Sequence, residues 1–175
     1  GQLIKKKKFK FKQHPKISII SPIYNRAKFI LRFLRSIQNQ FYEDLEIIFV
    51  DDFSTDNSVK MIEKYQREDE RIILLKHKKN KGTLITRNDG ILFSKGEFII
   101  IPDPDDILSK DILDACYKTS KEKNVEMIRF NLLDKKTNNI FYDFYVNKLE
   151  SRVIYQPELS NIIYDTIGIK LLDWR

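Results

Sequence analysis

Runs of consecutive apolar residues alternate along this chain with segments in which apolar residues recur every three or four positions. The runs predict buried strands at four places, residues 16–21, 45–50, 72–75 and 97–101. The periodic segments predict a helix after each strand, and these helices end near residues 40, 68, 94 and 123. Such alternation is typical of a mostly parallel sheet with helices packed on its faces. The sequence therefore predicts an α/β fold.

Polar residues ahead of the periodic segments indicate where two of the helices begin. The tripeptide Ser54-Thr55-Asp56 supplies N-cap chemistry for the second helix, and Ser109 is suited to cap the fourth. Beyond the fourth helix the pattern predicts two more strands and is compatible with one more helix, at residues 125–132, 140–145 and 157–164.

The composition fits one domain. The chain has 175 residues, of which 42% are hydrophobic, and it contains no Ser/Gly-rich linker. We expect a basic N-terminal tail over residues 1–15 and a single domain over residues 16–175 that is truncated at its C-terminus. No apolar run approaches the ~20 residues needed to cross a bilayer. We therefore expect a location in the cytoplasm or at the cytoplasmic face of a membrane.

The formal net charge of +7 is concentrated in two lysine clusters, one from Lys5 to Lys12 and one from Lys76 to Lys81. Such clusters attract nucleic acid, anionic lipid or phosphorylated ligands, although many are simply solvated surface. Peripheral membrane contact through the N-terminal lysines is one hypothesis. We expect no nucleic-acid partner, because the lysines are not interleaved with an aromatic RNA-binding motif and the predicted site is acidic.

Cysteine and histidine offer little chemistry in this sequence. Cys116 is the only cysteine and stands among apolar residues of a predicted helix, so we expect a buried thiol in the core. His14 and His77 are isolated in sequence and belong to no metal-ligand pattern. We assign neither histidine a function.

Polar and acidic residues follow three of the predicted strands. In an open α/β sheet, ligands bind beyond the carboxyl ends of the strands. The residues at these ends are Pro22, Tyr24 and Asn25 after the first strand, Asp51 and Asp52 after the second, and Asp103, Asp105 and Asp106 after the fourth. The sequence therefore predicts a ligand site at one edge of the sheet.

The acidic segment Asp103-Pro104-Asp105-Asp106 brings three carboxylates close together, which is costly unless a cation or a hydrogen-bond network offsets their repulsion. Carboxylate oxygens suit Mg²⁺ or Mn²⁺, which take one or two of them and complete their shell with phosphates and water. Pro102 and Pro104 stiffen the segment. The alternative is an acidic turn with a helix cap at Asp105 or Asp106, and the segment alone does not decide between the two.

Two further features are compatible with a nucleotide ligand. An aspartate of the pair Asp51-Asp52 is placed to accept a hydrogen bond from the imide of a uracil ring, and Tyr24 is placed to stack on the base. Gly82 precedes a helix that carries Arg87, and a helix N-terminus with an arginine can bind a diphosphate. The alternatives are a polar strand end for the aspartate and a surface ion pair for the arginine.

Taken in order, these motifs resemble the inverting glycosyltransferase family 2, which has the GT-A fold. The resemblance rests on residues 17–25, 47–56, 80–90, and 96–99 together with 103–106, and extends from about Lys16 to Phe130. It implies a Rossmann-like three-layer α/β/α sandwich and transfer of a sugar from a nucleotide-sugar donor, most often a UDP-sugar, to an acceptor hydroxyl with inversion. The acceptor, whether glycan, lipid or protein, stays undetermined.

The resemblance also assigns residues to the site. It implies that the nucleotide-sugar contacts Pro22, Tyr24, Asn25, Asp52, Gly82, Arg87 and Asp103. It implies that Mn²⁺ or Mg²⁺ is bound by Asp105, with Asp103 beside it, in the family's DxD motif. Phe53 and Thr86 depart from the smaller residues usual in the family, and Pro102 and Pro104 flank the acidic residues. The catalytic base is expected beyond residue 175 and is assigned to no residue here.

Other readings remain at this point. A non-catalytic nucleotide-binding or scaffold module of the same fold would keep donor affinity without turnover, and a basic nucleic-acid-binding protein is a weaker alternative. A receiver-like phosphoacceptor domain would call for a lysine at a later strand end that we do not identify. A Rossmann dehydrogenase is disfavoured because no G-x-G-x-x-G motif follows the first strand.

Overall fold

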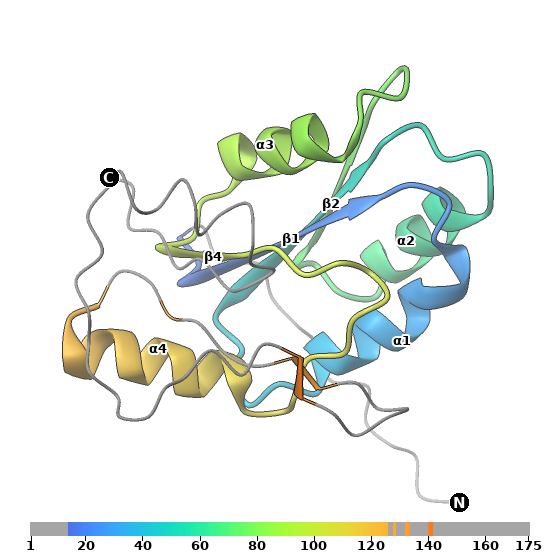
Figure 1. The fold of residues 1–175 in the computed structure, drawn as a ribbon. Helices are drawn as coiled ribbons and strands as arrows, with labels where there is room; N and C mark the ends of the chain where they lie inside the picture. The colour runs from blue at the N-terminus through green and yellow to red at the C-terminus, as the bar shows by residue number, and fades with distance from the viewer. Residues whose placement is uncertain (1–13, 126–127, 129–131, 134–139, 142–175) are drawn as a thin grey trace, which may run out of the picture.

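The protein is a three-layer α/β/α sandwich in the computed structural model (Figure 1), which describes residues 14–125, 128, 132–133 and 140–141. A four-stranded parallel sheet forms the middle layer, in the order β3-β2-β1-β4. The strands are β1 (Ile17–Ile23), β2 (Leu45–Asp51), β3 (Ile72–Lys76) and β4 (Phe98–Ile100). This confirms the predicted α/β class and the mostly parallel sheet.

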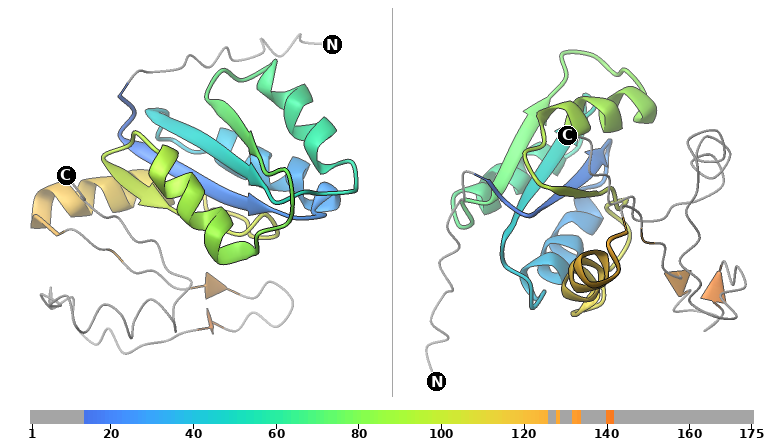
Figure 2. Two further views of the ribbon diagram at one scale, coloured as in Figure 1. Left: turned by 90° about the horizontal axis from the view of Figure 1, so that it is seen from above. Right: turned by 90° about the vertical axis from the view of Figure 1, so that its left-hand side faces the viewer.

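In the part of the chain that the structure describes, four helices cover the two faces of the sheet. They are α1 (Ala27–Gln38), α2 (Ser58–Gln66), α3 (Thr83–Phe93) and α4 (Ile112–Lys123). Figure 1 shows α3 on one face, and α1, α2 and α4 on the opposite face; the views in Figure 2 show the same layers from above and from the side. Among the described residues, no helix is long and apolar enough to cross a membrane.

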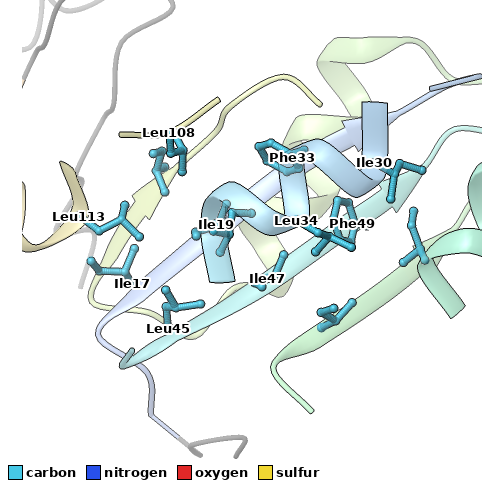
Figure 3. Close-up of a cluster of buried hydrophobic side chains, with 14 of the residues drawn as sticks. Ile17, Ile19, Ile30, Phe33, Leu34, Leu45, Ile47, Phe49, Leu108 and Leu113 are labelled. Carbon is cyan, nitrogen blue, oxygen red and sulfur yellow. The ribbon is translucent and has the colours of Figure 1, made fainter. Parts of the chain in front are cut away.

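The larger part of the core lies between the sheet and helices α1, α2 and α4. Alternate residues of the strands point to this face, and the apolar stripe of α1 packs against them through Ile30, Phe33, Leu34 and Ile37. Figure 3 shows Phe33 and Leu34 of α1 beside Ile19, Ile47 and Phe49 of the sheet. Phe33 and Phe49 meet edge to face, with ring centroids 6.1 Å apart.

Helix α3 packs on the other face against a smaller apolar cluster built around Ile20, Ile48, Val50 and Ile99. The β1 and β2 strands are therefore buried on both faces, as their continuous apolar runs predict. Parallel pairing aligns Pro22 with Val50 and Ile23 with Asp51, so β1 and β2 end at the same edge. The register carries the polar residues after these strands to one place.

The four strands and four helices predicted between residues 16 and 123 are confirmed, and the differences lie at their ends. Helix α4 begins at Ile112 after Asp111, so the expected cap at Ser109 is wrong. Helix α2 begins at Ser58 after Asn57, although Asp56 does accept a hydrogen bond from the Ser58 amide, over 2.8 Å. Cys116 is 5% exposed in the main core, which confirms the buried thiol, and this burial raises its pKa to about 11.

The segment after α4 is described in part. Two short strands, β5 (Leu132–Leu133) and β6 (Ile140–Phe141), pair antiparallel and coincide with parts of the two strands expected there. The compatible helix near 157–164 and most of the predicted basic tail lie outside the described residues.

Candidate functional site

A pocket lies at the point where the order of the sheet reverses. From β1 the chain crosses to β2 and then β3 on one side, while β4 pairs with β1 on the other side. Ligands of open α/β sheets bind in the crevice that this reversal creates at the carboxyl ends of the strands. The pocket is lined by Pro22, Ile23, Tyr24, Arg26, Asp52, Thr83, Thr86, Arg87, Asp103, Pro104 and Asp105. The predicted site edge is thus one continuous surface, which we call the strand-end pocket.

The strand-end pocket has a volume of about 190 Å³. Most small-molecule sites measure roughly 300–1,000 Å³. The described residues therefore enclose part of a ligand of nucleotide size. Pro22 is buried in this wall, whereas Tyr24 is 48% exposed, so its ring is accessible for stacking.

Asp52 is buried in the pocket wall, and both of its carboxylate oxygens accept hydrogen bonds. Oδ1 accepts from the backbone amide of Lys81 over 2.7 Å, and Oδ2 accepts from the amide of Gly82 over 2.8 Å. Burial acts to raise the pKa of Asp52, but these bonds and one to the His77 ring together lower it below the ordinary value. Asp52 is therefore an ionised acceptor that also holds the loop before α3.

His77 contacts a residue of the pocket wall, and the sequence patterns assigned it no function. Its ring lies between Asp52, 2.8 Å from Nδ1, and Asp89, 2.9 Å from Nε2. Asp89 also pairs with the ammonium of Lys81 over 2.9 Å. These partners lie 12 and 25 positions away from His77 in the sequence, so no local motif signals them. The one sequence feature that could have indicated these contacts is the position of His77 just beyond a predicted strand.

The N-terminus of α3 faces the pocket. Gly82 precedes the helix with φ of 85°, a conformation that favours glycine, and no side chain caps this end. Thr86, which departs from the small residue usual in the resembling family, is buried and donates its hydroxyl to the Gly82 carbonyl over 2.8 Å. The first amides of α3 therefore have no side-chain cap and can bind an anion.

Arg87 extends from the second turn of α3 to the acidic segment after β4. Its Nη2 donates to Oδ1 of Asp103 over 2.8 Å. Its Nε is buried and has no hydrogen-bond partner among the described residues. Arg87 thus pairs with one carboxylate of the site, and its side chain is still 34% exposed at the pocket.

The acidic segment is a tight loop whose carboxylates have different surroundings. Oδ2 of Asp106 accepts from the Asp103 amide over 3.1 Å, which closes the loop. Burial raises the pKa of Asp106, and the nearby charges of Asp103 and Asp105 add to this increase. Asp105 is exposed on the pocket side, and its backbone carbonyl accepts from Arg32 over 2.7 Å. Asp106 therefore stabilises the loop, whereas Asp103 and Asp105 face the pocket.

The carboxylates of Asp103 and Asp105 suit a cation that is coordinated jointly by the protein and a ligand, rather than one that is coordinated by protein side chains alone. Among the residues that the structure describes, no group of three or more His, Cys, Asp or Glu side chains could hold a metal. Asp103 and Asp105 supply hard oxygen ligands in the pocket wall. Mg²⁺ and Mn²⁺ commonly take one or two carboxylates and complete their shell with ligand phosphates and water. The donor set thus suits a cation bound together with a phosphorylated ligand.

Asn25 lies beside the pocket and joins two loops. With φ of 52°, it places its side-chain oxygen 2.8 Å from the amide of Thr55 and 3.2 Å from the amide of Asp56. In return, Asp56 accepts from the Ala27 amide over 3.0 Å. Neither Asn25 nor Gly82 lines the pocket, whereas the other predicted site residues do. Contact of Asn25 with a ligand stays a prediction.

Comparisons with known proteins give a consistent picture. The family model described as Glycosyl transferase family 2 matches residues 18–170. "Glycosyltransferase GlyG" of Streptococcus pneumoniae serotype 4 is 36% identical over 131 residues, which cover 74% of this chain and 43% of that protein. "Poly(ribitol-phosphate) beta-glucosyltransferase" of Bacillus spizizenii is 38% identical over 115 residues, which cover 64% of this chain and 18% of that protein.

A solved structure agrees with the fold. Residues 1–349 of TarS from S. aureus, in complex with UDP-GlcNAc, superpose with a TM-score of 0.62 and 25% identity, over 81% of this chain and 37% of that chain. The chain spans less than half the length of each of these relatives.

Proposed function

The chain belongs to glycosyl transferase family 2, and on that premise we propose that the strand-end pocket binds a nucleotide-sugar, specifically a UDP-sugar, for transfer to an acceptor hydroxyl. The observation that carries this proposal is the meeting of an exposed aromatic ring, an ionised carboxylate and an uncapped helix N-terminus in one pocket. The ring and the carboxylate suit a nucleobase, and the helix N-terminus suits a diphosphate.

The nucleobase is assigned to the side of the pocket formed by β1 and β2. There Tyr24 offers a ring face, and Asp52 accepts an N–H group from the edge of the base. Pro22 forms the buried wall behind them. A base with an imide N–H, such as uracil, suits the ionised carboxylate of Asp52, because that group only accepts hydrogen bonds.

The diphosphate is assigned to the N-terminus of α3. Thr83, the first residue of α3, and Arg87 in its second turn both line the pocket, so the first amides of the helix and the guanidinium lie on one side of it. Both features favour a negatively charged ligand. On binding, Arg87 can share its guanidinium between Asp103 and a phosphate oxygen.

Asp105, with Asp103 beside it, is assigned to hold a divalent cation together with the diphosphate. The chemistry that Mg²⁺ or Mn²⁺ supplies at such a site is stabilisation of the charge on the departing nucleoside diphosphate. The chain's own residues bind and orient the donor. Asp106 holds the acidic loop closed through the Asp103 amide, so that the two pocket carboxylates keep their positions.

Inversion at the anomeric carbon is part of the proposal and rests on the resemblance to inverting enzymes. The acceptor and the base that deprotonates it are assigned to no residue of this chain. A non-catalytic nucleotide-binding module of the same fold is the second candidate, since every residue assigned here serves binding. Donor binding without transfer by a longer form of the protein would favour it.

A panel of nucleoside diphosphates tests the proposal. The chain is titrated with UDP, CDP, GDP and ADP in the presence of Mn²⁺, and each dissociation constant is measured by calorimetry. We expect UDP to bind at least about tenfold more tightly than CDP, because cytosine lacks the imide proton and one unpaired polar group costs about 1–3 kcal/mol. Equal binding of all four would contradict the assignment of Asp52 to the base.

A further inference from the structure

The imidazole of His77 joins two carboxylates that belong to different elements. Nδ1 is 2.8 Å from Oδ1 of Asp52, which directly follows β2, and Nε2 is 2.9 Å from Oδ2 of Asp89 on α3. The His77 side chain is 7% exposed, so water competes weakly for either nitrogen. The ring therefore fixes the carboxylate of Asp52 relative to helix α3.

The hydrogen bonds require a doubly protonated ring. Burial acts to raise the pKa of Asp52, but its hydrogen bonds lower it overall, and the hydrogen bond from Lys81 lowers the pKa of Asp89. Both groups are thus ionised, and an ionised carboxylate only accepts hydrogen bonds. A neutral ring would turn a lone pair towards one of the two carboxylates. The bridge is complete only when both nitrogens of His77 donate.

The charged groups around the ring come from each element packed against it. Asp52 faces it from the end of β2 and Asp89 from α3, while Lys81 in the loop before α3 reaches it through Asp89. The backbone amide of His77 also donates to the carbonyl of Asp51 over 2.9 Å. The ring is thus held between two negative charges, with one positive charge behind Asp89.

The bridge leaves one acceptor position open on Asp52. An ionised carboxylate offers about four such positions. Oδ1 has two partners, the His77 ring and the Lys81 amide, while Oδ2 has one, the Gly82 amide. The open position is therefore on Oδ2. Since Asp52 lines the strand-end pocket, a ligand in the pocket can use this position.

We propose that His77 is a positioning residue for the nucleobase, whose protonated ring locks Asp52 so that Oδ2 receives an N–H group of the base. The inference rests on the proposed function, because it takes the base to lie against Asp52. Donor binding then depends on the protonation of His77, which does not itself line the pocket.

The protonation state is tested first, without any ligand. The sequence has two histidines, and the His14→Gln variant retains only His77. Nitrogen-15 NMR of the imidazole ring is recorded on this variant. His14 is exposed and outside the pocket, so its replacement leaves the site intact. We expect both ring nitrogens of His77 to show the protonated signature near neutral pH. A neutral tautomer would overturn the inference.

The second test compares UDP affinity across pH in the wild type and in His77→Phe. Deprotonation of the ring at high pH would remove one of its two hydrogen bonds, so wild-type affinity should fall about tenfold there, the loss expected for one charge-assisted hydrogen bond. His77→Phe should bind at the weaker level throughout. The ionisation of UDP itself affects both proteins equally, so their difference isolates His77.

Asp89→Asn serves as a second variant, because it removes one carboxylate and leaves Asp52 in place. With less negative charge beside the ring, the fall in affinity should move to lower pH. Equal UDP binding by the wild type and His77→Phe at every pH would leave His77 a structural residue and overturn the inference. A wild type that binds no UDP at any pH would contradict the proposed function itself, and the inference with it.

Discussion

Gly90 on α3 lies against Ile20 on β1 so closely that a methyl group at Gly90 would overlap the Ile20 side chain. The same methyl group would be 3.1 Å from Cγ2 of Val50. Both neighbours are β-branched core residues with little freedom to move. This contact sets the distance between α3 and the sheet, and therefore the position of the helix N-terminus at the pocket.

Gly90→Ala is accordingly expected to destabilise the protein. The overlap should cost about 1–3 kcal/mol, which is offset in part by the better helix propensity of alanine, about 1 kcal/mol. Urea denaturation followed by circular dichroism measures the difference. Asn88→Ala is the matched control, because Asn88 is exposed on the same helix and should be neutral or slightly stabilising. A Gly90→Ala variant as stable as this control would show that α3 can shift outwards.

Phe53 is the residue of the site loops with the least favourable backbone conformation. Its φ is 68°, where a bulky side chain costs about 1–2 kcal/mol, and its side chain is 51% exposed. Phe53→Asn should therefore raise the free energy of unfolding by about 0.5–1 kcal/mol, since asparagine tolerates this conformation. The melting temperature reports the change, and Phe41→Asn, also exposed, should give no gain. A loss of stability in Phe53→Asn would mean that the ring makes contacts worth more than the strain.

The ionised state of Asp52 predicts a pH dependence of stability. Its folded pKa is lowered below the ordinary 3.8, so its contribution is complete above that value and is lost as the pH falls through the lower folded value. At neutral pH, Asp52→Asn should be less stable than the wild type by about 1–3 kcal/mol. The difference should shrink progressively as the pH falls below 3.8. A difference that stays constant with pH would indicate that the charge of Asp52 has no part in holding the loop before α3.

Arg87 is expected to contribute directly to UDP binding. Arg87→Gln should weaken UDP binding about tenfold or more, because a charge-assisted hydrogen bond contributes about 1.5–3 kcal/mol. Isothermal titration measures the affinity. Arg35→Gln removes the same charge from an exposed position on α1, outside the pocket, and should bind UDP like the wild type. Equal losses in the two variants would point to general charge attraction.

Local patterns predict the strands and the pocket well in this chain for a physical reason. The β1 and β2 strands are buried on both faces, so their continuous apolar runs identify them, and parallel pairing then brings the residues after the strands to one edge. Pro22, Tyr24 and Asp52 could be placed together by this argument, and the parallel pairing of β4 with β1 adds Asp103.

Contacts between distant segments account for what the sequence did not reveal. The end of α1 and the start of α4 are tied together through Gln40, whose amide donates to the Ser109 carbonyl over 2.6 Å, and Ser109 does not cap α4. The loops after β1 and β2 are joined by Asn25, and Asp52 is joined to α3 by His77. Each of these bonds links residues that no local pattern brings together, so each had to be read from the structure.

The central claim is that Asp105 and the strand-end pocket bind a nucleoside diphosphate together with a divalent cation. Titration of the chain with UDP, in Mn²⁺ and in a chelator, tests it most directly when repeated on Asp105→Ala. We predict that the wild type binds UDP more tightly with Mn²⁺ and that Asp105→Ala loses this gain while remaining folded. Binding that is unaffected by Mn²⁺, or a gain that Asp105→Ala retains in full, would contradict the account.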